Sequence, residues 1–264
     1  MQELQFSYRM RLDFSEPAAK HQFTLRMFPK TDARQQIMEC EVKLEPECNL
    51  SKGEDTFGNR YLYGEISQEH TCFSVEVFGR AAVDRKDVFL WREDEINRYR
   101  YPSRYTKTGE KLRTYFAKVK KESGKTGYAF AKDLMDQLYR DIQYRQGVTT
   151  ISTTAEEALI QKQGVCQDYA HIMIALCRLE GIAARYVVGM MLGEGYSHAW
   201  VEVCTDGVWH GIDPTNRRLV DENYIKISHG RDYQDCIVNR GVFLGGGIQT
   251  QTVKVEVKQI ERGA

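Results

Sequence analysis

The sequence predicts an α+β protein in which strands come first, helices follow and strands return. Apolar residues alternate with polar ones through much of the first hundred positions, which is the pattern of half-buried strands. Beyond residue 105 apolar residues instead recur every three or four positions, the period of a helix. From Arg185 onward the pattern is again that of strands.

Residues 1–100 are expected to form an N-terminal β-sandwich domain. Alternation is clearest from Leu4 to Leu12, and turn-prone stretches separate the strand-like segments that follow. Several short strands at such spacing are typical of a sandwich. The polar and aromatic run at 98–103 interrupts the pattern. We therefore place the domain boundary there and assign residues 101–264 to a second domain.

Four helices are expected in the second domain. Each of the first two has one apolar face. The third opens at Thr154, because Thr154 and Glu157 match a capping box. The fourth begins at or near Cys166 and stops at Gly181.

The composition indicates a soluble globular chain and argues against several partners. The 264 residues include 37 Lys and Arg and 37 Asp and Glu, a formal net charge of zero, so no nucleic-acid or membrane partner is expected. No stretch approaches the roughly 20 apolar residues of a membrane helix and no export signal is recognisable, so we expect a cytoplasmic protein.

Seven cysteines lie scattered without a CxxC pair, which argues against a disulfide framework and against a structural zinc site.

Cys166 is the candidate nucleophile. It lies between Gly164, which ends one helix, and the start of the next helix, where free backbone N–H groups and the helix dipole favour the thiolate. A cysteine is more commonly a small buried hydrophobic residue, as expected of Cys177 in the helix interior. Cys166 therefore needs a base before the catalytic interpretation is preferred.

A predicted hairpin supplies such a base. The Asp-Gly pair at 206–207 between two alternating segments is a strong hairpin signal, and a two-residue turn pairs Val203 with His210. In this register His198 and Asp213 are diagonal neighbours on one face, roughly 7 to 8 Å apart at the backbone, which two side chains can span. The carboxylate can then orient the imidazole, as in nucleophilic triads.

Several motifs resemble the bacterial transglutaminase-like superfamily, whose members are often described as cysteine proteases. The resemblance lies in four motifs, in the family's order and at compatible spacing: Gly164–His171, Cys177–Gly189, His198–Val203 and Gly211–Asn216. The flanking stretches 153–159 and 229–235 are also similar to the family. The stretches 34–36 and 55–59 are similar to the N-terminal β-domain of its bacterial members. The resemblance covers most of the chain.

The resemblance implies a papain-like transglutaminase core, in which the nucleophilic cysteine opens a helix packed on an antiparallel sheet. The residue-by-residue match makes Cys166 the nucleophile, His198 the base and Asp213 its orienting group. Asp168 also matches a family position, but capping the helix start is the simpler role for it. The oxyanion would bind the backbone N–H of Cys166 and a side-chain donor, for which Tyr144 is a candidate. Neither a metal nor an organic cofactor is implied.

We expect a cysteine hydrolase of the protease type, which cleaves an amide bond in a peptide, protein or other amide substrate through an acyl-enzyme. Three alternatives remain: a transglutaminase that cross-links protein glutamines to amines, a non-catalytic binding module that retains the fold, and a redox thiol protein. Tyr196, Trp200 and Trp209 are candidate cleft residues, although aromatic residues at strand spacing more commonly belong to the packing.

Overall fold

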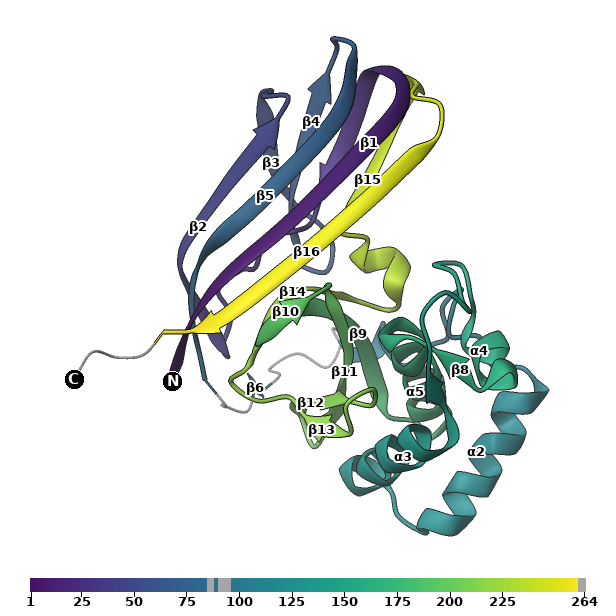
Figure 1. Cartoon of the computed structure of the whole chain (residues 1–264). Helices are drawn as coiled ribbons and strands as arrows, with labels where there is room; N and C mark the ends of the chain where they lie inside the picture. The colour runs from purple at the N-terminus through teal and green to yellow at the C-terminus, as the bar shows by residue number, and fades with distance from the viewer. Residues whose placement is uncertain (85–87, 90–95, 261–264) are drawn as a thin grey trace.

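The computed structural model describes residues 1–84, 88–89 and 96–260 (Figure 1). The predicted order of strands, helices and strands is confirmed. The strands form two main sheets, and the helices gather beside the smaller one. Among these residues, no helix is long and apolar enough to cross a membrane.

The larger sheet has eight antiparallel strands and is built around β1 (Gln2–Leu25), a strand of 24 residues. The first half of β1 pairs with β5 (His70–Val83) and β16 (Gln249–Gln259), and its second half pairs with β4 (Arg60–Ile66) and β15 (Asn239–Gly245). The other members of this sheet are β2 (Gln35–Glu45), β3 (Leu50–Glu54) and β10 (Gly193–Gly195). Because β1 changes partners partway along its length, the sheet curls back on itself (Figure 1).

The alternating pattern predicted for the first strand is confirmed. Every second side chain from Leu4 to Phe14 is buried, while those between them are exposed or half-buried. The buried side chains fill the inside of the curled sheet together with rings such as Phe23 and Phe73, whose centroids lie 4.6 Å apart. Burial of apolar surface inside the curl is therefore what the period-2 pattern encodes.

The predicted division of the strands near residue 100 is wrong. β15 and β16 pair along β1, so strands from residues 239–259 join the sheet formed by the N-terminal strands. An alternating pattern predicts a strand but not its partner, because the partner is set by contacts between segments distant in sequence. The predicted β-sandwich is not confirmed either, since the strands form one curled sheet.

The helices lie in the middle of the chain. They are α2 (Glu110–Ser123), α3 (Gly127–Asp141), α4 (Ala155–Gln161) and α5 (Cys166–Leu179), and two short segments, β7 (Gln143–Tyr144) and β8 (Gln163–Gly164), form a parallel pair beside them. The predicted capping box at the start of α4 is confirmed, because Thr154 and Glu157 each bond the backbone N–H of the other. Helix α5 begins at Cys166, as predicted.

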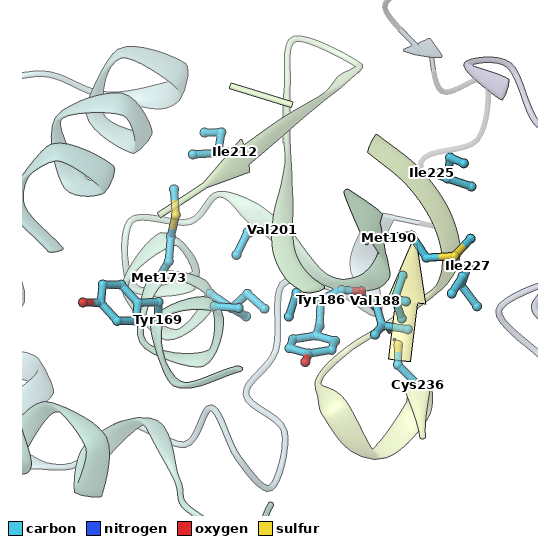
Figure 2. Packing of buried hydrophobic residues seen from close by; sticks show 14 of the residues in the cluster. Tyr169, Met173, Tyr186, Val188, Met190, Val201, Ile212, Ile225, Ile227 and Cys236 are labelled. Atoms are coloured by element: carbon cyan, nitrogen blue, oxygen red, sulfur yellow. Dashed lines mark hydrogen bonds between the residues drawn. The ribbon is translucent and has the colours of Figure 1, made fainter. Parts of the chain in front are cut away.

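The smaller sheet is the platform on which α5 packs. Its strands run in the order β13 (Arg218–Leu219), β12 (Val208–Asp213), β11 (His198–Thr205), β9 (Ala183–Met191) and β14 (Tyr224–Gly230), with β6 (Val88–Phe89) beside β12 and a 3-10 helix, η1 (Tyr233–Cys236), after β14. Met173 of α5 lies against Val201 and Ile212 of this sheet (Figure 2). The same buried cluster continues past β9 to Ile225 and Cys236.

Two buried amide side chains from the larger sheet bind the outer edge of β14. Gln35 accepts from the Lys226 N–H (2.8 Å) and donates to the Lys226 carbonyl (2.7 Å). Asn59 accepts from the His229 N–H (2.9 Å) and donates to the His229 carbonyl (2.8 Å). Each amide thus takes the place of a neighbouring strand, which satisfies backbone groups that burial would otherwise leave unpaired.

Replacing Gln35 by alanine should therefore lower the free energy of unfolding by roughly 2 to 4 kcal/mol, because the Lys226 N–H and carbonyl lose their partner. The matched control is Gln36→Ala, an exposed neighbour on the same strand, which should change stability by no more than about 0.5 kcal/mol. Urea unfolding measures both. Equal losses in the two variants would contradict this role for Gln35.

Candidate active site

Cys166 lies in the first turn of α5, and Asp168 holds that helix start in place. The Asp168 carboxylate accepts hydrogen bonds from the Val165 N–H (2.7 Å) and the Thr149 hydroxyl (2.8 Å). Burial raises the pKa of Asp168, and these hydrogen bonds oppose the rise. Gly164 leaves room for the carboxylate, since a Cβ there would lie 2.5 Å from an Asp168 oxygen. Asp168 thus caps the helix, the simpler of its predicted roles.

Arg178, near the other end of α5, fixes the helix to its surroundings. Its guanidinium donates to the carbonyl oxygens of Tyr99, Ala184 and Arg231 and to the Thr106 hydroxyl, at 2.6 to 2.9 Å. Burial lowers the pKa of Arg178 to about 10, although a nearby aspartate opposes the shift. Sequence analysis missed this residue, because no local pattern distinguishes a buried arginine from an exposed one.

The hairpin that carries His198 has the predicted register. β11 and β12 pair Val203 with His210 across the turn at 206–207, where both residues have positive φ (52° and 75°). This geometry fits a type I′ turn, which an Asp-Gly pair favours. As predicted, His198 and Asp213 meet, with 2.7 Å between Nε2 and Oδ2.

Asp213 is buried and held by several donors. Its Oδ2 also accepts from the Tyr224 hydroxyl (2.9 Å) and the Asn216 amide (2.8 Å), and its Oδ1 accepts from the backbone N–H groups of Thr215 and Asn216. Burial alone would raise the pKa of Asp213, but hydrogen bonds from His198, Asn216 and Tyr224 lower it. The sequence analysis named neither Asn216 nor Tyr224 as a site residue. Asn216 falls within a family motif, whereas Tyr224 comes from another strand and carries no such signal.

His198 lies between Asp213 and Cys166. Burial works against its charged form, but the hydrogen bonds and charges of Asp213 and Cys166 outweigh burial and raise the pKa of His198 to about 10. Because Nε2 binds Asp213, Nδ1 is the nitrogen left to face the sulfur. The raised pKa therefore favours an imidazolium at His198, with Cys166 beside it.

The other six cysteines have different surroundings. Burial raises the pKa of each of them, to about 12 for Cys177 and well above the ordinary value for Cys236. All seven thiols are free of disulfides. Within the described part of the chain, no three His, Cys, Asp or Glu side chains gather as metal ligands would.

Tyr144 lies next to the segment that leads into the nucleophile. β7 pairs it with Gly164, two residues before Cys166, and half of its side chain is exposed. Its role as an oxyanion donor stays a prediction.

The three candidate cleft aromatics lie in different environments. Tyr196 is 66% exposed, two residues before His198, and its role in a cleft stays a prediction. Trp200 and Trp209 are only 1% and 3% exposed, so both belong to the packing, and a place for them in a substrate cleft stays a prediction. Trp200 packs against His198, with 6.4 Å between ring centroids, and the guanidinium of Arg185 lies over Trp209.

Comparisons with known proteins define the class of this protein. The chain matches a model of the transglutaminase-like superfamily over residues 113–214 and a model of the bacterial transglutaminase-like N-terminal region over residues 4–82. The chain therefore contains a transglutaminase-like core and a bacterial transglutaminase-like N-terminal region, as its motifs predicted. The first match contains Cys166, His198 and Asp213.

Individual relatives are similar over part or all of the chain. An uncharacterized protein of Mycobacterium tuberculosis is 42% identical over 127 residues, so the match spans 42% of this chain and only 40% of that relative's length. An uncharacterized protein of Mycobacterium leprae is 27% identical over 272 residues. That match covers 94% of this chain and 95% of the length of the relative. A solved structure of a proposed cysteine protease from Cytophaga hutchinsonii is 23% identical in sequence and superposes with a TM-score of 0.82. The match covers 100% of this chain and 92% of the chain in that structure. This similarity shows a shared fold.

We expect His198 to stay protonated well above neutral pH in the native protein, with a pKa near 10. In Cys166→Ala the thiolate is absent, so the pKa of His198 should fall. NMR titration of the histidine ring signals measures both values. His171 is the internal control, since burial and Arg178 lower its pKa to about 3 and it should stay neutral throughout. The same His198 pKa in both proteins would argue against the pairing with Cys166.

Iodoacetamide at neutral pH should alkylate Cys166 faster than the other six cysteines, because His198 stabilises its thiolate while burial raises the pKa of the others. Peptide mapping after brief labelling gives the order of reaction. His198→Ala should slow labelling of Cys166 and leave the rest unchanged. Preferential labelling of another cysteine, with Cys166 untouched, would remove the case for an activated nucleophile.

Proposed function

We propose that this protein is a cysteine-dependent amide or peptide bond hydrolase, in which Cys166, His198 and Asp213 act as a triad. The observation that carries the proposal is the position of His198, which binds buried Asp213 through Nε2 and has its pKa raised by Asp213 and Cys166 together. A buried carboxylate that orients the base, next to a cysteine at a helix N-terminus, is the arrangement that nucleophilic catalysis requires.

The first half of the reaction forms an acyl-enzyme. The Cys166 thiolate adds to the carbonyl carbon of the amide, and the C–N bond breaks as the His198 imidazolium gives its proton to the departing amine. A thioester on Cys166 and a neutral His198 remain. Asp213 keeps the imidazole aligned through both proton transfers, because its carboxylate is fixed by Asn216 and Tyr224 as well.

Water completes the reaction. Neutral His198 takes a proton from a water molecule whose oxygen attacks the thioester carbonyl, and the C–S bond breaks to release a carboxylic acid. The thiolate and the imidazolium are thereby restored. An amine in place of water would give the cross-linking reaction instead, but that outcome needs an amine site and the exclusion of water.

The developing oxyanion would be stabilised at the start of α5. The first N–H groups of a helix have no partner within the helix, and the backbone N–H of Cys166 is one of them. The Tyr144 hydroxyl, on the neighbouring β7, is the candidate second donor. Asp168 is already occupied with the helix start, so it has no step in this scheme.

His198→Ala should abolish amide hydrolysis, with a loss of roughly thousandfold or more, because both proton transfers lose their carrier. Asp213→Asn should keep the fold but reduce the rate by up to roughly 10⁴-fold, since an amide no longer fixes the imidazole tautomer. A panel of peptide and glutamine amides, with the released amine and the new carboxyl group both measured, separates hydrolysis from transfer to an added amine.

His210→Ala is the matched control on the same hairpin. His210 stacks on Tyr128, with ring centroids 4.2 Å apart, and its strand position turns it away from His198. Its removal should therefore alter packing but leave the chemistry intact. Loss of activity in His210→Ala together with full activity in His198→Ala would overturn the proposed triad.

A further inference from the structure

A second polar region lies on the face of the smaller sheet opposite α5. Here the segment Thr56–Gly58 of the larger sheet meets the smaller sheet around a cavity of about 230 Å³. The cavity is lined by that segment and by Arg98, Tyr99, Arg185, Trp209 and His229. None of these residues takes part in the proposed reaction, so the site is independent of the proposed function.

The charges around this cavity do not balance. Arg185 and Lys226 both bind one oxygen of the buried Glu202, at 2.6 and 2.7 Å, so these three side chains together carry one net positive charge. Arg98 adds a second positive charge, and its guanidinium donates to the Thr56 carbonyl (2.7 Å) at the rim. Of the residues that line the cavity in the described chain, none carries a carboxylate.

This positive charge affects the pKa of two neighbouring groups, His229 and Lys226. Burial and then the charges of Arg185, Lys226, Lys30 and Arg98 lower the pKa of His229 well below its ordinary range. Burial and then the charge of Arg185 also lower the pKa of Lys226, although Glu202 and Asp32 oppose the shift. Positive charges that disfavour a further proton on His229, which lines the cavity, would favour an anion in the same place.

The ring of Trp209 also lines this cavity. The indole N–H of Trp209 is buried and has no hydrogen-bond partner in the part of the chain that the structure describes. The rings of Phe57, Tyr99 and Trp209 form the apolar part of the lining.

We infer that this cavity binds a small doubly charged oxyanion, namely a phosphate group, between the guanidinium groups of Arg98 and Arg185. A dianion balances the two net positive charges, and guanidinium groups match the oxygen geometry of phosphate. The cavity is smaller than the roughly 300 to 1,000 Å³ that drug-sized ligands occupy, so the ligand is inorganic phosphate or a small phosphate monoester.

The test is an NMR titration of the Trp209 indole N–H signal with inorganic phosphate, against chloride at matched ionic strength. Trp209→Phe assigns the signal, and a parallel titration with methyl phosphate distinguishes free phosphate from an ester. Phosphate should shift the Trp209 signal saturably and leave that of Trp200 in place. Arg98→Gln should weaken binding by roughly tenfold or more, because a charge-assisted contact is lost.

Arg113→Gln is the control, since Arg113 is an exposed arginine on α2, away from the cavity. It should bind phosphate with the native affinity. A Trp209 signal that does not move at tens of millimolar phosphate, or that moves equally well in Arg98→Gln, would overturn the proposal.

Discussion

The hydrogen bond between His198 and the buried carboxylate of Asp213 is the interaction on which the site depends. It joins the two strands of one hairpin and leaves the other ring nitrogen for Cys166. The carboxylate can stay charged in the interior because Tyr224, Asn216 and backbone N–H groups donate to it. Without these donors, burial would favour its protonated form and the imidazolium would lose its partner.

Both sheets hold the segment that precedes His198. β11 belongs to the smaller sheet, but β10, just before it in the chain, pairs with β16 of the larger sheet. Tyr8 of β1 also hydrogen-bonds to the side chain of Ser197, and burial raises the pKa of Tyr8 to about 12. Strands far from the site in sequence thus help to place the histidine, in addition to the Gln35 and Asn59 contacts with β14.

Local features of the site could be predicted from the sequence, and long-range ones could not. The start of α5 and the hairpin register follow from short-range chemistry, a glycine before the helix and an Asp-Gly turn, and both are confirmed. Strand spacing also made Trp200 and Trp209 candidate cleft residues. It could not show that both side chains are almost fully buried, on the side of the sheet where Glu202 pairs with Arg185 and Lys226. Likewise, the sheet that β16 joins depends on a partner more than two hundred residues away.

The most direct test of the central claim is the ultraviolet absorbance of the Cys166 thiolate as a function of pH. The difference spectrum between the native protein and Cys166→Ala should show one thiolate at neutral pH, which disappears on acidification as His198 keeps its proton and the sulfur gains one. In His198→Ala the neutral-pH signal should be lost. A neutral thiol at Cys166 in the native protein, or a thiolate that persists without His198, would contradict the account.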